Sequence, residues 1–299
     1  MTTLLHSMTP RQLINEAGDL VSLPEVCFRI NQLADDPTSS AHEIGQVISQ
    51  DTTLSARLLK IVNSAFYGFP GRIDTISRAI TIIGTKELRD LALMTAACNL
   101  FNGIPSNLIN MERFWHSSLA CGVLARRLAE ASQVLHPDRL FVMGVLHDIG
   151  RLVMFQQLPV PSRDILLISK GRDDLIVVAE REVLGFTHGD VGYELASDWL
   201  LPTPICSAIR WHHLPEQATT NLLECQLIYI SNILADALVW DSDLKTEMER
   251  IQSGSWSLTG LTPAVCQQAV SELGNEIREL YAILMGQVQT PSAVRSPGR

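Results

Sequence analysis

The sequence predicts an all-α protein made of two packed helical lobes. Apolar residues recur three and four positions apart through most of the chain, as at Ile44, Val47 and Ile48 and again at Leu54 and Leu58, so they share one helix face. The apolar–polar alternation typical of strands is nearly absent. Hydrophobic residues make up 46% and charged residues 18% of the 299 residues, which is a globular composition with enough apolar material for a sizeable core. We expect more than half of the residues to be helical.

The first lobe is predicted over residues 1–105 as short helices joined by tight turns. Segment 50–53 interrupts the first apolar pattern and offers capping side chains for a helix over 54–62. Another helix is predicted over 75–83. Gly84 ends it, and the pattern resumes after Thr85.

The second lobe is predicted over residues 106–240, with a helical extension and flexible tail over 241–299. The boundary falls in segment 102–110, which is rich in Asn, Gly, Pro and Ser. After residue 240 we expect one or two more helices up to 288, then a frayed tail over 289–299. The helices predicted within the second lobe cover 114–132, 139–155, 176–184, 188–200, 204–212 and 222–239.

Composition argues against several classes of function. The net charge of −9, with Arg126 and Arg127 as the densest basic pair, argues against nucleic-acid binding, which rests on clustered Lys and Arg. The six cysteines are scattered without C-x-x-C spacing, which indicates a reducing compartment. The N-terminus has no basic region followed by an apolar run, so we expect a cytoplasmic protein. The uncharged stretch 91–111 contains Asn, Gly and Pro residues that lipid would leave unsatisfied, so we expect no membrane span.

The strongest chemical signal is the adjacent pair His147 and Asp148, an imidazole and a carboxylate within a predicted apolar helix. Histidine nitrogen and carboxylate oxygen are ligands that suit zinc, iron or manganese. Two ligands do not make a site. Further donors must therefore come from elsewhere in the fold.

Candidate donors lie downstream at predicted helix ends. His188 follows Thr187, which forms a capping-box pattern with Asp190, and His212 and His213 end another helix. A single histidine at a helix C-terminus can simply interact with the free carbonyl groups. Taken together, these histidines indicate a metal site more strongly than each does alone.

Several motifs resemble the HDOD family, which is related to the metal-dependent HD phosphohydrolases and the HD-GYP cyclic-dinucleotide phosphodiesterases. The resemblance covers residues 19–240, and the run Leu58–Gly68 is its most specific part in the first lobe. The matching segments are 23–26, 48–51 and 58–68 in the first lobe and 114–115, 144–151, 185–188, 208–213 and 231–234 in the second. The resemblance implies an HD-like helical second lobe.

The resemblance also implies a metal set of one histidine, the HD pair, further histidines and a late aspartate, and two of these positions differ here. Ser117 stands where the first histidine is expected, and His116 is offset by one residue, about 100° around a helix. Asn232 stands at the late aspartate position, while Asp236 lies one turn later on the same face. The implied site is therefore incomplete.

The remnant site consists of the five residues His147, Asp148, His188, His212 and His213. We expect their side chains to converge and to satisfy one another by hydrogen bonds. They would hold either no cofactor or one divalent transition metal (iron, manganese or zinc). Arg151 matches a basic residue of the family motif, but it also fits a solvated arginine at a helix end.

The resemblance and these departures together predict a regulatory module without catalytic activity. It would act through other signalling proteins or a small nucleotide ligand, with no nucleic acid or membrane as partner. The alternative is a metal-dependent phosphohydrolase acting on a cyclic dinucleotide or a nucleotide, because the HD pair is retained.

Overall fold

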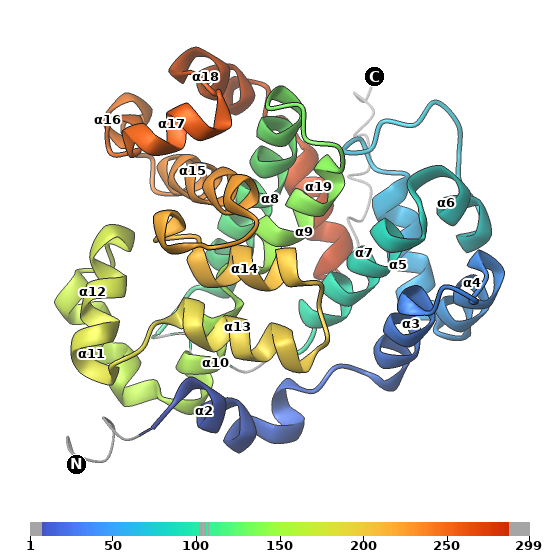
Figure 1. Cartoon of the computed structure of the whole chain (residues 1–299), viewed down its shortest axis with the longest axis horizontal. Helices are drawn as coiled ribbons and strands as arrows, with labels where there is room; N and C mark the ends of the chain where they lie inside the picture. Colours follow the sequence, from blue (N-terminus) through green and yellow to red (C-terminus); the bar gives the residue numbers. More distant parts are fainter. Residues whose placement is uncertain (1–7, 102–103, 105, 107, 287–299) are drawn as a thin grey trace, which may run out of the picture.

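The computed structural model describes residues 8–101, 104, 106 and 108–286, and every regular element in those ranges is a helix (Figure 1). The prediction of an all-α fold with more than half of the residues in helices is confirmed. The first helices along the chain are α2 (Pro10–Ala17), η1 (Gly18–Val21), α3 (Glu25–Asp35), α4 (Ala41–Gln50), α5 (Thr52–Val62), α6 (Ile76–Ile83) and α7 (Thr85–Ala97).

The second group of helices follows the loop at 102–110, part of which lies outside the described residues. It comprises α8 (Met111–Ala131), α9 (Pro137–Leu146), α10 (Ile149–Gln157), α11 (Pro159–Ser169), α12 (Asp173–Leu184), α13 (His188–Asp198), α14 (Thr203–Trp211), η2 (Pro215–Gln217) and α15 (Leu222–Val239). Helix α11 was not predicted from the sequence.

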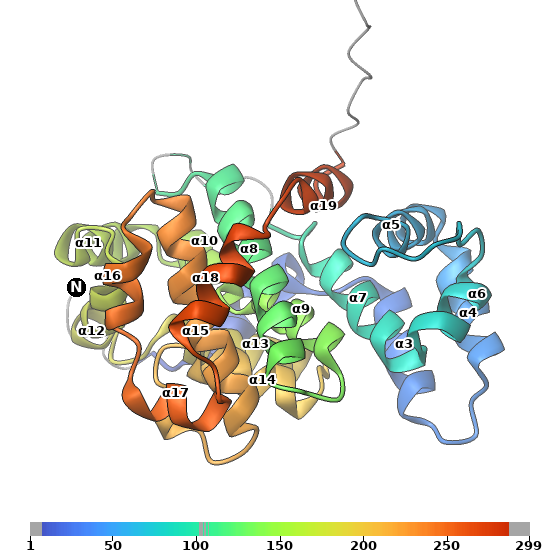
Figure 2. The same cartoon turned by 90° about the horizontal axis from the view of Figure 1, so that it is seen from above.

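The two groups lie at opposite ends of the molecule. Figure 2 shows α3 to α7 at one end and α11 and α12 at the other, with α8 and α9 between them. Helix α2 is the exception, because it packs on α13 and α10 although it lies within the predicted first lobe. Phe66 joins the groups: its ring lies 4.5 Å from that of Phe141, and its carbonyl accepts a hydrogen bond from Arg126.

Helix α8 is the centre of the second group. It packs along α9 and α15. At Gly144 of α9, an added Cβ would lie 2.5 Å from the Cα of Gly122 of α8, so the two backbones touch. Among the described residues only α15 has the length and apolar composition of a membrane span, and 56% of it is buried in the protein.

The C-terminal extension holds four helices rather than the predicted one or two, and the predicted tail over 289–299 lies outside the described residues. They are α16 (Leu244–Glu249), α17 (Ser253–Thr259), α18 (Pro263–Ser271) and α19 (Glu276–Leu284). Each is shorter than three full turns, so apolar periodicity could not separate them. Side-chain caps at Asp243 and Thr262 mark two of their starts.

Helix α19 packs on both α8 and α5, so it lies across the seam between the two groups. Its Tyr281 ring stacks on His116 of α8 at 4.4 Å between ring centres. Its Glu279 accepts a hydrogen bond from the backbone N–H of Ala65 at 3.1 Å. The extension therefore holds the two ends of the molecule together.

Candidate metal centre

His147 and Asp148 lie at a break between α9 and α10, so the prediction of one helix over 139–155 was wrong. The Nδ1–H of His147 donates to the carbonyl of Gly144 at 2.6 Å. That carbonyl is the acceptor that a continuing α-helix would pair with the backbone N–H of Asp148. The side chain competes with the helix for this carbonyl, and the chain turns at the HD pair.

His212 lies at the end of α14 in the same local arrangement. Its Nδ1–H donates to the carbonyl of Ile209 at 2.7 Å. Because a carbonyl oxygen can only accept, the proton is on Nδ1, and Nε2 is the ring atom that faces inward. His213 follows directly, and its ring centre lies 4.2 Å from that of His212.

His188 is the first residue of α13, whose start carries the predicted capping box. The side chain of Thr187 accepts from the backbone N–H of Asp190, and the Asp190 carboxylate accepts in return from Thr187. Glu180 accepts hydrogen bonds from both the backbone N–H and the Nδ1–H of His188, at 2.9 and 2.8 Å. These bonds also turn Nε2 of His188 inward.

Glycines bring the helices of the site close together. A Cβ on Gly150 of α10 would lie 2.0 Å from the carbonyl oxygen of His188, and one on Gly189 would lie 2.6 Å from the carbonyl oxygen of Arg210. Helices α10, α13 and α14 therefore pack backbone to backbone beside the site. This packing sets the distance between the HD pair and the downstream histidines.

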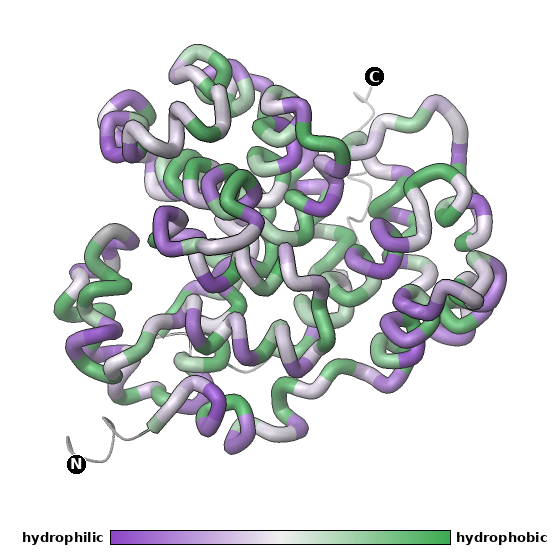
Figure 3. The backbone as a smooth tube through the Cα atoms, in the orientation of Figure 1, coloured by the Kyte–Doolittle hydropathy of each residue, from purple (hydrophilic) through white to green (hydrophobic). Residues whose placement is uncertain are grey.

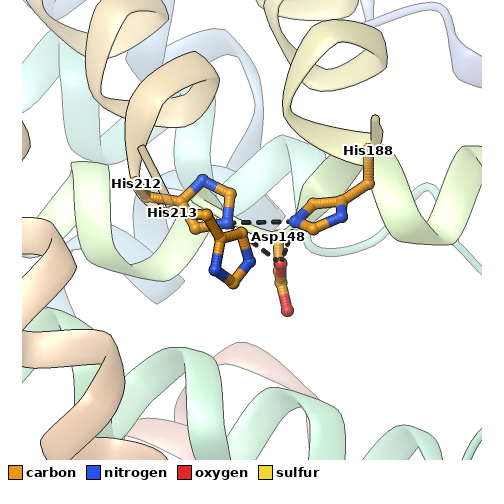
Figure 4. A group of neighbouring side chains, drawn as sticks. All are labelled: Asp148, His188, His212 and His213. Atoms are coloured by element: carbon orange, nitrogen blue, oxygen red, sulfur yellow. Dashed lines mark hydrogen bonds and ion pairs between the residues drawn. The ribbon is translucent and has the colours of Figure 1, made fainter. Parts of the chain in front are cut away.

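Four of the five predicted residues form one cluster (Figure 4). One ligand atom from each of Asp148, His188, His212 and His213 lies within 4.8 Å of the others. The Nε2 atoms of His188 and His212 are 3.0 Å apart, and Oδ1 of Asp148 is 3.2 Å from Nε2 of His188.

His147 lies beside this cluster with its inward nitrogen engaged elsewhere. Its Nε2–H donates to Oδ1 of Asn232 at 3.0 Å, and Nε2 is 3.8 Å from Oδ2 of Asp148. The amide of Asn232 is itself fixed, because its Nδ2–H donates to Asp173 at 3.1 Å. Asn232, which stands at the late aspartate position, thus occupies Nε2 of His147, the histidine of the HD pair.

Burial and neighbouring charges shift the pKa values of the titratable side chains in the site. Burial disfavours a charged Asp148, but Arg151, whose guanidinium donates to Oδ2 at 2.8 Å, and His147 hold the pKa of that carboxyl well below its usual range. Burial also disfavours a charged His188, but Glu180 and Asp148 outweigh it and raise its pKa to about 10. Burial and the neighbouring histidines lower the pKa of His212 and His213 well below the ordinary value.

The comparison with known sequence families places most of the chain in one known domain. The HDOD domain matches residues 20–215, about two thirds of the chain and the whole site except Asn232. The chain belongs to the HDOD family. An uncharacterized protein from Treponema pallidum is 29% identical over 203 residues, which are 67% of this HDOD chain and 39% of that relative. The chain thus spans well under half the length of the curated relative it matches.

Solved structures share the same fold. An HDOD domain protein with unknown function from Geobacter sulfurreducens is 24% identical, with a TM-score of 0.70 over 95% of this chain and 97% of that one. A proposed phosphohydrolase from Shewanella amazonensis is 21% identical, with a TM-score of 0.72 over 91% of this chain and 97% of that one. A proposed signal transduction protein from Marinobacter aquaeolei is 20% identical, with a TM-score of 0.68 over 96% of this chain and 69% of that one.

The donor set of this HDOD cluster fits a metal ion. Oδ1 of Asp148 and Nε2 of His213 are buried without a hydrogen-bond partner, so the predicted mutual satisfaction is incomplete. The inward nitrogens of His188 and His212 face each other, while their outer N–H groups are held by Glu180 and a carbonyl. Outer acceptors of this kind orient histidine ligands in metal sites. The cluster could therefore hold a metal.

The positions around the missing ligands are occupied by other contacts. Ser117 donates to Asp236 at 3.1 Å. Burial, together with Asp173 and Asp148, raises the pKa of Asp236 well above its ordinary value. His116 stacks on Tyr281 of α19, away from the cluster.

Sequence reasoning missed Asp173 and Glu180, both on α12. Asp173 contacts Asn232, and its carboxylate lies 3.5 Å from Nδ1 of His213. Glu180 is only 2% exposed although it is a carboxylate. The one sequence signal for it is a glutamate eight residues before His188 at apolar helical spacing, between Ile176 and Leu184.

A cavity of about 200 Å³ adjoins the cluster. Its polar lining includes Ser117, Asp148, Arg151 and Asp236, so it reaches the carboxylate of the HD pair. Aromatic and basic side chains also line it, and the guanidinium of Arg113 lies 4.0 Å from the ring centre of Trp240. A small molecule can approach the cluster through this cavity.

Proposed function

We propose that this HDOD chain is a regulatory module whose HD site holds one divalent transition metal (iron, manganese or zinc) and does not hydrolyse phosphate esters. Asp148, His188, His212 and His213 would hold the ion. The ion would supply a positive charge, and by binding these four side chains it would link the α9–α10 break to α13 and to the end of α14. The module would act through other signalling proteins.

The observation that carries this proposal is the contact between His147 and Asn232. In the HD pattern both positions supply metal ligands, but here the amide of Asn232 accepts from Nε2 of His147. Ser117, at the remaining ligand position, donates to Asp236 instead. A two-metal site that activates water needs more donors than this arrangement leaves.

The adjoining cavity supports a small nucleotide as the second input of the module. Phe114 offers an aromatic ring for a base, and Arg151 and Arg113, which lies over the ring of Trp240, offer guanidinium groups for a phosphate. The buried Asp236 favours its neutral form and would not repel an anion. The chain's own residues would bind and orient this ligand without cleaving it.

A second candidate function is a metal-dependent phosphohydrolase acting on a nucleotide or cyclic dinucleotide. One observation favours it: the cavity reaches Asp148 directly, so a phosphate could approach the ion. This candidate and the regulatory module make opposite predictions in one experiment.

The experiment measures metal content and hydrolysis in the purified protein. We expect at most one transition metal per chain and no hydrolysis of a cyclic dinucleotide or of bis(p-nitrophenyl) phosphate with added manganese or iron. Two metals per chain would favour the phosphohydrolase, and hydrolysis that a folded Asp148→Ala variant loses would show that the protein is an enzyme.

Restoring the two missing ligands tests the assignment of positions. Ser117→His combined with Asn232→Asp should raise metal affinity at least tenfold, because it replaces a hydroxyl and a neutral amide by an imidazole and a carboxylate, which are stronger metal ligands. The control is Ser257→His with Asn275→Asp, the same change of composition at exposed positions away from the site. An equal affinity for the two folded variants would contradict the assignment.

A further inference from the structure

The carboxylate of Asp148 divides its two oxygens between the metal cluster and Arg151. Oδ1 lies 3.2 Å from Nε2 of His188 and 3.5 Å from Nε2 of His212, and it has no hydrogen-bond partner. Oδ2 accepts a hydrogen bond from Nη1 of Arg151 at 2.8 Å. Only 10% of the Asp148 side chain is exposed, so solvent screens neither side well. One buried carboxylate therefore faces both the position of the proposed ion and a permanent cation.

Both carboxylates that pair with Arg151 belong to the cluster or contact it. Besides Asp148, Nη1 of Arg151 lies 3.5 Å from Oδ1 of Asp173. The other carboxylate oxygen of Asp173 lies 3.5 Å from Nδ1 of His213. Nε of Arg151 is buried without a hydrogen-bond partner, so the guanidinium keeps a donor that neither carboxylate uses.

Arg151 also lines the cavity of about 200 Å³ that adjoins the cluster. Figure 3 shows hydrophobic segments along the hairpin of α11 and α12, and Leu166 and Gly171 of this hairpin line one side of the cavity. The cavity lining includes Asp148 but none of the three histidines of the cluster. A ligand in the cavity would thus meet the cluster only through Asp148 and Arg151.

An ion at the cluster and the guanidinium of Arg151 would compete for the charge of Asp148. Both are cations, and both lie beside the same buried carboxylate. Charges interact far more strongly inside a protein than in water, so the guanidinium weakens the binding of a divalent ion. A phosphate brought against Arg151 would offset its charge and relieve this competition.

We propose that Arg151 couples the cavity to the metal cluster, so that a phosphate-bearing ligand in the cavity and the metal ion each strengthen the binding of the other. Linkage requires the two effects to be equal, because the coupling free energy belongs to the pair of ligands. The proposal rests on the proposed function and names how the ion and the small nucleotide act on each other. The module would respond most strongly when both are present.

Zinc titrations test the coupling in the full chain. The probes are AMP, GMP, CMP and UMP, each compared with its nucleoside, which lacks the phosphate. We expect at least one nucleotide to raise the zinc affinity about fivefold or more, after correction for zinc bound by free nucleotide, and its nucleoside to leave it unchanged. Zinc should raise the affinity for that nucleotide by the same factor. A zinc affinity that none of the four nucleotides raises would overturn the proposal.

Two variants separate the effect of Arg151 from direct contact between the phosphate and the ion. In Arg151→Gln, the zinc affinity without nucleotide should rise about fivefold or more, and a nucleotide should raise it no further. Arg113→Gln is the matched control, because Arg113 also lines the cavity but contacts Trp240 and the carbonyl of Val239. It should lower the nucleotide affinity but not change the zinc affinity measured without nucleotide. A folded Arg151→Gln protein with the zinc affinity of the wild type, or with the coupling intact, would contradict the role of Arg151.

Failure of the coupling and failure of the proposed function give different results. Zinc and a nucleotide that bind independently would overturn the coupling alone. A chain that binds no zinc would overturn the proposed function and the coupling together. Hydrolysis of the bound nucleotide would overturn the proposed function, while the zinc affinities of the two variants would still decide the coupling.

Discussion

At the scale of single residues, Glu180 determines the state of His188. Its carboxylate accepts from both the backbone N–H and the ring of His188 inside the protein. The raised pKa favours the imidazolium form of His188, while the lowered pKa values of the adjoining His212 and His213 favour the neutral form. Glu180, together with Asp148, therefore separates the protonation state of His188 from those of His212 and His213.

This separation predicts a stability maximum near neutral pH in chelator-treated protein. Below pH 6.5, the ordinary pKa of histidine, the unfolded chain takes up protons at His212 and His213 that the folded protein does not bind. The free energy of unfolding therefore falls by about 1.4 kcal/mol per pH unit for each of these histidines. From 6.5 towards about 10, folded His188 keeps a proton that the unfolded chain loses, so stability falls again. Urea unfolding between pH 5 and 9 measures both limbs.

A variant isolates the alkaline limb. His188→Gln removes the group with the raised pKa, so stability should become flatter between pH 6.5 and 9. The exposed His42 serves as a control, because His42→Gln should keep the slope. The same alkaline slope in both variants would show that His188 does not hold the proton.

The residues of the site differ in how far the sequence reveals them. His147, Asp148, His188, His212 and His213 could be named because a family motif or a helix end marks each. Asp173 and Glu180 could not, because no motif marks α12 and their role depends on how the hairpin folds back onto α13. The contact between Asn232 and His147 spans 85 residues and required the packed structure.

At the scale of elements, the site depends on helices that approach at glycines. A Cβ on Gly150 would meet the backbone of α13 at both His188 and Gly192, at 2.0 and 2.6 Å. Backbone atoms cannot move aside as a flexible side chain can. Helix α10 could accept a larger residue only by separating from α13.

Gly150→Ala should therefore lower the free energy of unfolding by about 1–3 kcal/mol and weaken metal binding, because it moves His188 away from Asp148. Gly254→Ala on α17 is the matched control, since a Cβ there meets nothing within 4 Å. Chemical denaturation and metal titration of both variants measure the effects. A Gly150→Ala protein as stable as wild type would show that the helices are not in close contact.

Element boundaries show why prediction succeeded in some places and failed in others. Helix α15 was predicted at its observed bounds, because one apolar pattern runs from Leu222 to Val239. The break at His147 was missed because the apolar pattern continues through it, and a side-chain hydrogen bond rather than a glycine or proline interrupts the helix. Competition between the His147 side chain and a backbone N–H for the carbonyl of Gly144 does not change the spacing of apolar residues in the sequence.

At the scale of the whole molecule, α19 couples the two ends. Leu280 and Leu284 are fully buried in the seam with α8 and α5. Leu280→Ala should lower the free energy of unfolding by about 2–5 kcal/mol, while Leu258→Ala at an exposed position of α17 should have little effect. Calorimetry should show one transition that moves to lower temperature. Two separate transitions in the wild type would mean that the ends unfold independently.

The bond between Ala65 and Glu279 closes a loop of 214 residues. Closing a longer loop costs more chain entropy, and contacts between distant residues slow folding. The metal cluster draws its residues only from the stretch between the α9–α10 break and the end of α14. We therefore expect the histidines to assemble during refolding before α19 reaches α5, and the seam to close last.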